Sequence, residues 1–440
     1  MNNKKWMAIL LGGIMAASLA APCSVSAAEK TTLTFWHAMG GTNGEVLQQI
    51  VDDFNASQDE IEIKAEYQGT YDDTITKLKA AMQSDSGLPD VCQMYDVGTK
   101  FMYDSGAVIP VEDKFESTGY DKSSVMEVIS SYYTVDGKQY AMPFNVSTPM
   151  LYYNKDVFEA AGLDPETPPT TYDEVLEDAK KIVESGAAPV GYSQAIYGWF
   201  FEQQLAGLGV TYGNNDNGRT EAVTAVDFDS NGGGLKVFDM WKKLYDSGCF
   251  EDYGTTTADT QTAFFSGQVG MIIESTAILK NAVDSSPFEV GTGYLPRIEQ
   301  NDEGGVIIGG GSLWLTDTGN EANEDAAWKF IEYITTPDVQ AKWSMGTGYF
   351  AINEKAYETE DMKAYLKENP NFETAINQLK DSPVNCNTAG VLSGVQTEAR
   401  LTFNEIMPQV YDGKLTTQDA VDQLAASVNK AIENYNESIK

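Results

Sequence analysis

Histidine, arginine and cysteine are scarce in this chain. Its 440 residues include a single histidine, His37, and the arginines Arg219, Arg297 and Arg400 alone. One imidazole cannot build a His-rich zinc site, an HExxH metalloprotease centre or a histidine-relay triad. No GxSxG segment is present, so a hydrolase nucleophile of that kind is unsupported. These absences count against an enzyme, and we expect neither a metal nor a cofactor.

Positive charge is also in short supply. Lys and Arg number 29 against 65 Asp and Glu, which gives a formal net charge of −36. A surface this acidic repels phosphate backbones and anionic lipid, so we expect no nucleic-acid partner and regard a membrane surface as an unfavourable one. The acidity itself favours solubility.

The first residues have the pattern of an export signal. Lys4 and Lys5 precede an apolar run over residues 6–21, and small residues follow over 23–28. A positive end, an apolar middle and an A-x-A-like end predict a signal peptide over residues 1–28. The run is shorter than the roughly 20 residues that a membrane span needs. We expect export across the inner membrane to the periplasm, with a cell-surface lipoprotein anchored through Cys23 as the alternative.

The remaining cysteines are Cys92, Cys249 and Cys386. An odd number does not make a disulfide framework, and Cys92 lies in an apolar run typical of a buried thiol. A Cys249–Cys386 bridge is compatible with the sequence, which does not decide it.

The N-terminal part alternates strand and helix patterns. Strands are predicted over 31–36, 61–67 and 89–94, and apolar residues at helical spacing separate them. This order implies a parallel sheet with right-handed crossovers. Ligands of such sheets lie beyond the carboxyl ends of the strands, so the loops 37–41, 69–71 and 95–98 are candidates for a shared site.

The chain is too long for one core, since a single core rarely exceeds about 250–300 residues. An extended stretch over 140–153 predicts a crossover between two lobes near residues 144–149. Helices are predicted over 234–247, 259–266, 323–335 and 338–343. Thr416 and Asp419 have the spacing of a capping box ahead of a C-terminal helix.

Three further segments have competing interpretations. Residues 227–232 resemble the start of a calcium loop, but Phe238 stands where the loop needs Glu, so a turn that starts a helix is favoured. The glycines 309–311 indicate either a close backbone approach or a strand bulge. The Arg400 guanidinium suits a phosphate or carboxylate, and a surface ion pair with Glu398 or Glu405 is the alternative.

Taken together, the chain resembles the extracellular solute-binding proteins of ABC importers (family 1), and within them the glycerol-phosphate-binding branch. The segments that carry the resemblance are 35–39, 67–71, 95–98, 143–149, 151–155, 162–165, 264–267, 307–314 and 347–349. The resemblance implies an α/β, two-lobed periplasmic-binding-protein fold with a hinge and an interlobe cleft. Lobe 1 would comprise residues 29–145 and 291–345, and lobe 2 residues 146–290 and 346–440.

The resemblance also implies a set of ligand-binding residues. They are Tyr71, Asp96, Ser147, Trp199, Ser275, Gly310, Tyr349 and Arg400. Asp96 stands where the family has Glu, and Ile196 stands where it has a second Trp. The Arg400 guanidinium, the hydroxyls of Ser147, Ser275 and Tyr349, and the Gly310 N–H would hold a phosphate, while Asp96 and Tyr71 would hold hydroxyl groups.

The implied function is the substrate-binding component of an ABC importer. A monomer would bind sn-glycerol 3-phosphate or a related glycerophosphodiester between its lobes and deliver it to the membrane permease. The alternative is a neutral sugar, with Trp36, Trp199 and Trp314 as stacking walls.

Overall fold

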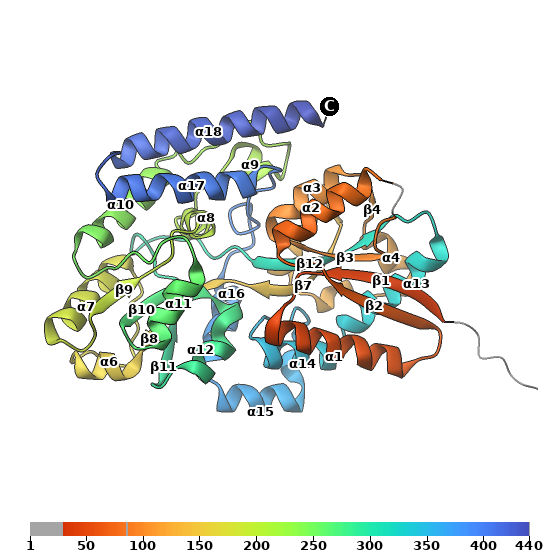
Figure 1. Ribbon diagram of the computed structural model, residues 1–440, viewed down its shortest axis with the longest axis horizontal. Helices are drawn as coiled ribbons and strands as arrows, with labels where there is room; N and C mark the ends of the chain where they lie inside the picture. Colours follow the sequence, from red (N-terminus) through yellow and green to blue (C-terminus); the bar gives the residue numbers. More distant parts are fainter. Residues whose placement is uncertain (1–29, 85–86, 440) are drawn as a thin grey trace, which may run out of the picture.

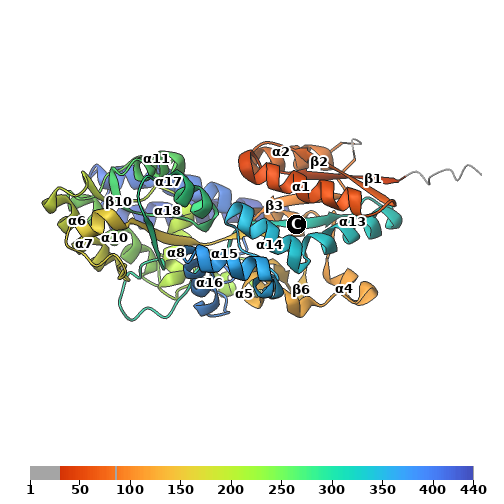
Figure 2. The same ribbon diagram turned by 90° about the horizontal axis from the view of Figure 1, so that it is seen from below.

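A computed structural model describes residues 30–84 and 87–439 of the chain. The expected signal peptide and Cys23 lie outside these residues. The described chain forms two lobes, each built around its own sheet and flanked by helices (Figure 1). Figure 2, seen from below, shows the same two lobes side by side. Within the described ranges, no helix combines the length and apolar character needed to cross a membrane.

The first lobe contains a six-stranded sheet. Its strands are β2 (Ile61–Tyr67), β1 (Thr31–His37), β3 (Val91–Tyr95), β12 (Gly309–Thr316), β4 (Val108–Ile109) and β7 (Met142–Ser147). β1 runs parallel to β2 and β3, which confirms the predicted β-α-β-α-β order. β12 returns from much later in the chain and pairs antiparallel with β3, β4 and β7.

Helices cover this sheet on its faces and edges. They are α1 (Gly41–Ser57), α2 (Tyr71–Met82), α3 (Thr99–Asp104), α4 (Glu112–Thr118), α5 (Glu127–Ser130), α13 (Glu321–Ile334), α14 (Pro337–Thr347) and α15 (Glu360–Glu368). α1 buries Leu47, Ile50 and Phe54, the apolar residues whose helical spacing predicts it. A small hairpin of β5 (Thr134–Val135) and β6 (Lys138–Gln139) lies beside the sheet.

The second lobe has a four-stranded sheet in the order β11 (Val290–Gly293), β8 (Pro149–Asn154), β10 (Val269–Ser275), β9 (Val190–Ser193). Its helices are α6 (Lys155–Ala160), α7 (Tyr172–Ser185), α8 (Gly198–Gly207), α9 (Asn214–Gly218), α10 (Gly233–Asp246), α11 (Thr257–Phe265), α12 (Leu279–Ser285), α16 (Asn371–Asp381), α17 (Gln396–Tyr411) and α18 (Thr417–Ser438). α18 starts with the predicted capping box of Thr416 and Asp419.

The chain crosses between the sheets at the predicted place. β7 ends at Ser147 in the first sheet, and β8 begins at Pro149 in the second. Thr148 between them is fully buried, and its backbone exchanges hydrogen bonds with Thr276. A second crossing connects β11 to β12. A third crossing leads from α15 back to α16. Connecting segments of this kind between two lobes are the arrangement that hinge closure requires.

The exact division of the chain into lobe segments stays a prediction. The helices after residue 346 do not all lie together: α15 packs with α14, which packs on α1 of the first lobe. α16 packs on β11 of the second lobe, and α17 and α18 pack on α8 and α10.

A close contact between α8 and α17 fixes how these two helices of the second lobe lie against each other. α8 begins at Gly198, and a Cβ at that position would lie 2.5 Å from Cα of Arg400 on α17. The Gly198 N–H also donates to Asn404 Oδ1 of α17 at 2.9 Å. Only glycine allows the two backbones to come this close.

We therefore predict that Gly198→Ala separates α8 from α17 and destabilises the protein by about 1–3 kcal/mol through overpacking. Gly207→Ala is the matched control, because it lies on the same helix with nothing within 4 Å of its added Cβ. The control should stay within about 0.5 kcal/mol of the parent protein. Urea denaturation of both variants measures the difference, and equal stabilities would contradict the prediction.

Candidate ligand-binding cleft

A cavity of about 230 Å³ lies between the lobes. Its lining includes every site residue implied by the resemblance: Tyr71, Asp96, Ser147, Trp199, Ser275, Gly310, Tyr349 and Arg400. Residues separated by more than 300 positions in sequence thus meet at one place. Their contact with a ligand stays a prediction.

The ends of strands and helices supply these side chains. Tyr71 opens α2 directly after β2, and Asp96 begins the 3₁₀ turn η1 (Asp96–Gly98) directly after β3. Both therefore lie at the carboxyl edge of the parallel strands, as expected for a ligand site. Ser147 ends β7, and Ser275 ends β10 on the opposite lobe.

The glycine run 309–311 fits both interpretations that the sequence left open. The register of β7 and β12 shifts between Gly311 and Ser312, which is a strand irregularity. Gly310 has φ +90°, and a Cβ there would lie 1.8 Å from the carbonyl oxygen of Asn145. The missing side chain allows this close approach at the floor of the cavity.

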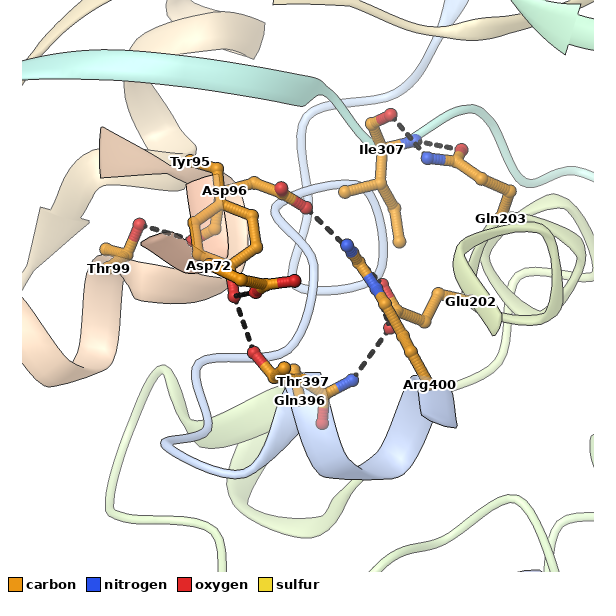
Figure 3. Close-up of polar contacts among 10 residues, drawn as sticks. All are labelled: Asp72, Tyr95, Asp96, Thr99, Glu202, Gln203, Ile307, Gln396, Thr397 and Arg400. Carbon is orange, nitrogen blue, oxygen red and sulfur yellow. Dashed lines mark hydrogen bonds and ion pairs between the residues drawn. The ribbon is translucent and has the colours of Figure 1, made fainter. Parts of the chain in front are cut away.

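Arg400 is buried and held by two carboxylates (Figure 3). Its Nε and Nη2 donate to the two oxygens of Glu202 at 2.8 and 2.7 Å. Nη2 also donates to Asp96 Oδ2 at 2.7 Å, across the cleft from the first lobe. The alternative of a surface ion pair with Glu398 or Glu405 is wrong, because the side chain turns inward from α17.

The two carboxylates determine the charge state of Arg400. Burial alone would lower the pKa of its guanidinium, but the charges of Asp96 and Glu202 outweigh burial and raise that pKa well above its usual value. Arg400 is therefore a fixed cation in the wall of the cavity.

A second contact joins the lobes beside the ion pair. The Tyr95 hydroxyl donates to Asp72 Oδ1 at 3.1 Å and shares a hydrogen bond of 2.6 Å with Thr397 Oγ1 of α17 (Figure 3). Tyr95 also stacks on Tyr71, with ring centroids 5.2 Å apart. The first lobe therefore meets α17 through both a charged and a neutral contact.

The cavity also offers donors that the protein does not use. Trp199 is 5% exposed, and its indole N–H has no hydrogen-bond partner. Nη1 of Arg400 makes no hydrogen bond within the described residues, since the bonds of the guanidinium all come from Nε and Nη2. The buried Trp199 N–H without an acceptor costs about 1–3 kcal/mol, which a ligand oxygen would recover.

Some residues expected at the site lie elsewhere. The loop after β1 does not line the cavity: His37 is buried between Phe35 and Tyr67, and burial lowers its pKa to about 4. Trp314 is fully buried in the first lobe, and Trp36 donates to Glu66. Of the three tryptophans proposed as stacking walls, Trp199 alone lines the cavity.

Tyr95 belongs to the candidate loop 95–98 and lines the cavity, whereas Tyr197, Thr257, Gln261 and Glu274 also line it and were missed by the sequence interpretation. Glu202, which lies behind Arg400, was missed as well. The available signal was a carboxylate inside an apolar run, because Glu202 follows Trp-Phe-Phe and Glu274 follows Met-Ile-Ile. Such buried acids mark functional positions more often than surface acids do.

Other candidates carry no site. The described cysteines Cys92, Cys249 and Cys386 are unpaired. The 227–232 segment forms a turn, in which Asn231 Oδ1 accepts the Gly233 N–H at the start of α10. Within the described ranges, no group of three or more His, Cys, Asp or Glu residues could hold a metal.

A larger hollow of about 830 Å³ includes Arg219 in its lining. The Arg219 guanidinium donates to the backbone carbonyls of Tyr132, Gly390 and Ala389. These bonds use its donors to join two segments of the chain, so the smaller cavity at Arg400 is the better candidate for a ligand.

Two α/β lobes joined by crossing segments, with a cavity between them that polar and aromatic side chains line, are the architecture of a solute-binding protein. The model of the bacterial extracellular solute-binding protein family matches residues 49–374, and the chain belongs to this family.

Individual relatives give the same classification. The chain is 31% identical over 417 residues to the sn-glycerol-3-phosphate-binding periplasmic protein UgpB of Escherichia coli K12, covering 93% of this chain and 94% of that protein. UgpB of Mycobacterium tuberculosis in complex with glycerophosphocholine matches with a TM-score of 0.79 and 20% identity, over 92% of this chain and 99% of that one. The cyclic alpha-maltosyl-1,6-maltose binding protein of Arthrobacter globiformis matches with a TM-score of 0.76 and 26% identity, over 92% and 100%.

The charge cluster predicts non-additive effects on stability. Arg400→Met leaves two carboxylates buried without a cation and should cost about 3–5 kcal/mol of unfolding free energy. Adding Glu202→Gln should restore part of that loss, because it removes one uncompensated charge. Chemical denaturation of the single and double variants measures this coupling.

Lys414→Met is the control for this cycle. It breaks the exposed pair with Asp412, whose atoms lie 2.6 Å apart, and should cost less than about 1 kcal/mol. Additive losses for Arg400→Met and Glu202→Gln would show that the buried cluster does not act as a unit.

Proposed function

We propose that this solute-binding protein captures sn-glycerol 3-phosphate or a related glycerophosphodiester and delivers it to an ABC-importer permease. The observation that carries the proposal is the set of donors around one cavity: Nη1 of Arg400, the unpaired Trp199 N–H, and the hydroxyls of Ser147 and Ser275. Fixed donors in a closed cleft act in a low dielectric, where they hold an anion more strongly than in water.

The overall charge of −36 does not oppose this proposal. Surface charges are screened over about 8 Å at physiological salt, so the ligand responds chiefly to the groups that line the cleft. Asp96 and Tyr71, on the first lobe, would accept or donate hydrogen bonds to the glycerol hydroxyls. Asp96 is shorter than the Glu of the family, so this contact would shift or include a water.

Binding without turnover is part of the proposal. The family consists of solute-binding proteins. Incubation of a glycerophosphodiester with the protein should therefore leave the mass of the ligand unchanged. We further propose that the protein acts as a monomer exported by the signal over residues 1–28.

The ligand class is tested by isothermal calorimetry and thermal shift with sn-glycerol 3-phosphate, glycerophosphocholine, inorganic phosphate and maltose. We expect at least one glycerol phosphate ester to bind and to stabilise the protein by about 2.7 kcal/mol at a hundredfold excess over Kd. Binding of maltose with no response to any phosphate ester would favour the sugar alternative, which the maltosyl-binding structural relative brings into consideration.

The role of the unpaired donors is tested by Arg400→Lys and Trp199→Phe. Lysine keeps the charge that compensates Asp96 and Glu202 but loses the guanidinium fork, and phenylalanine keeps an aromatic ring but loses the N–H donor and part of the indole volume. Each should weaken phosphate-ester binding by about tenfold, the value of one to two kcal/mol of hydrogen bonding. A calorimetric Kd unchanged in both variants would contradict contact between these donors and the ligand.

A further inference from the structure

Glu274 is a second buried carboxylate in the cavity wall, on the lobe opposite Asp96. It precedes Ser275 at the end of β10 and is 4% exposed. Its Oε2 accepts Gln261 Nε2 at 2.9 Å, and its Oε1 accepts the Ser275 N–H at 2.6 Å. Both partners are neutral, and no cation pairs with Glu274 in the part of the chain that the structure describes.

Arg400 does not compensate the charge of Glu274, because the Arg400 guanidinium already pairs with Glu202 and Asp96. The cavity lining and the side chains bonded directly to it therefore contain one guanidinium and four carboxylates, namely Asp72, Asp96, Glu202 and Glu274. Burial raises the pKa of Glu274, although its two hydrogen bonds lower it in part. A positive charge brought by a ligand would favour the ionised carboxylate and relieve this imbalance.

Aromatic rings surround the same space. Tyr197 lines the cavity beside Trp199, with ring centroids 6.1 Å apart, and Tyr71 and Tyr95 form the stacked pair on the other lobe. Faces of such rings attract cations, including quaternary ammonium groups that donate no hydrogen bond. The cavity thus combines a negative charge with aromatic faces, besides the donors for a phosphate.

We propose that Glu274 is a specificity-determining residue that selects glycerophosphodiesters with a cationic end group. This proposal rests on the proposed function and refines its ligand. The phosphodiester carries one negative charge, which Nη1 of Arg400 and the Trp199 N–H receive, while its ammonium end lies toward Glu274. A phosphomonoester brings up to two negative charges and no positive one, so Glu274 disfavours it.

The test compares three ligands on the full mature chain by calorimetry: glycerophosphocholine, glycerophosphoglycerol and sn-glycerol 3-phosphate. Glu274→Gln keeps the size and an acceptor for the Ser275 N–H, but removes the charge. The substitution should lower the affinity for glycerophosphocholine by about tenfold or more. The affinity for glycerophosphoglycerol, which has a neutral end, should change by no more than about threefold. The affinity for sn-glycerol 3-phosphate should stay equal or rise.

Glu251→Gln is the matched control, because it removes one acidic charge from an exposed position in the same lobe, outside the cavity. It should leave the preference among the three ligands unchanged. If Glu274→Gln lowered the affinity for all three ligands equally, or left the preference among them unchanged, the proposed role of Glu274 would be overturned. The proposed function would stay intact. Failure of the parent protein to bind any of the three would overturn both.

Discussion

The cleft depends on one buried cation held from both sides. Arg400 on α17 receives Glu202 from its own lobe and Asp96 from the other lobe, all within 2.7–2.8 Å. The Glu202 pair lies within one lobe and fixes the direction of the guanidinium. The Asp96 pair joins the lobes, so it depends on their relative position. One side chain therefore contributes both to the closed arrangement and to the donors available in the cavity.

Glu202 and Asp96 hold Arg400 from different lobes, and this difference has a physical consequence for binding. Under the proposed function, a phosphate that approaches Arg400 would meet free N–H groups at Nη1 and a carboxylate at Nη2. In the proposed complex, Asp96 would leave the guanidinium for a hydroxyl of the ligand without leaving Arg400 unpaired, because Glu202 remains. Glu202 thus compensates the buried charge of Arg400 within one lobe, and closure over the proposed ligand would exchange one interlobe contact for others.

Local patterns predicted the scaffold well and the site in part. The strand and helix periods placed Tyr71 and Asp96 at one sheet edge, and the rarity and chemistry of arginine singled out Arg400. The partner of Arg400 could not be predicted this way, because Glu398 and Glu405 are near in sequence while Glu202 is near only after α8 packs on α17 at Gly198. The prediction of Trp36 and Trp314 as site residues is wrong, because neither side chain lies at the cavity. Trp36 contacts Glu66 at the surface, and Trp314 is buried in the core.

The proposed uptake of an anionic ester by so acidic a protein requires local electrostatics to prevail over the global charge. The unpaired donors at Arg400 and Trp199 provide that locally for one negative charge. The surplus of carboxylates around them sets a limit, since each further anionic group on the ligand meets Asp96 or Glu274 in a medium that screens poorly. In our proposal, the wall that admits a phosphodiester would therefore oppose a more highly charged ligand, and a positive group on the ligand would be attracted by the surplus carboxylates.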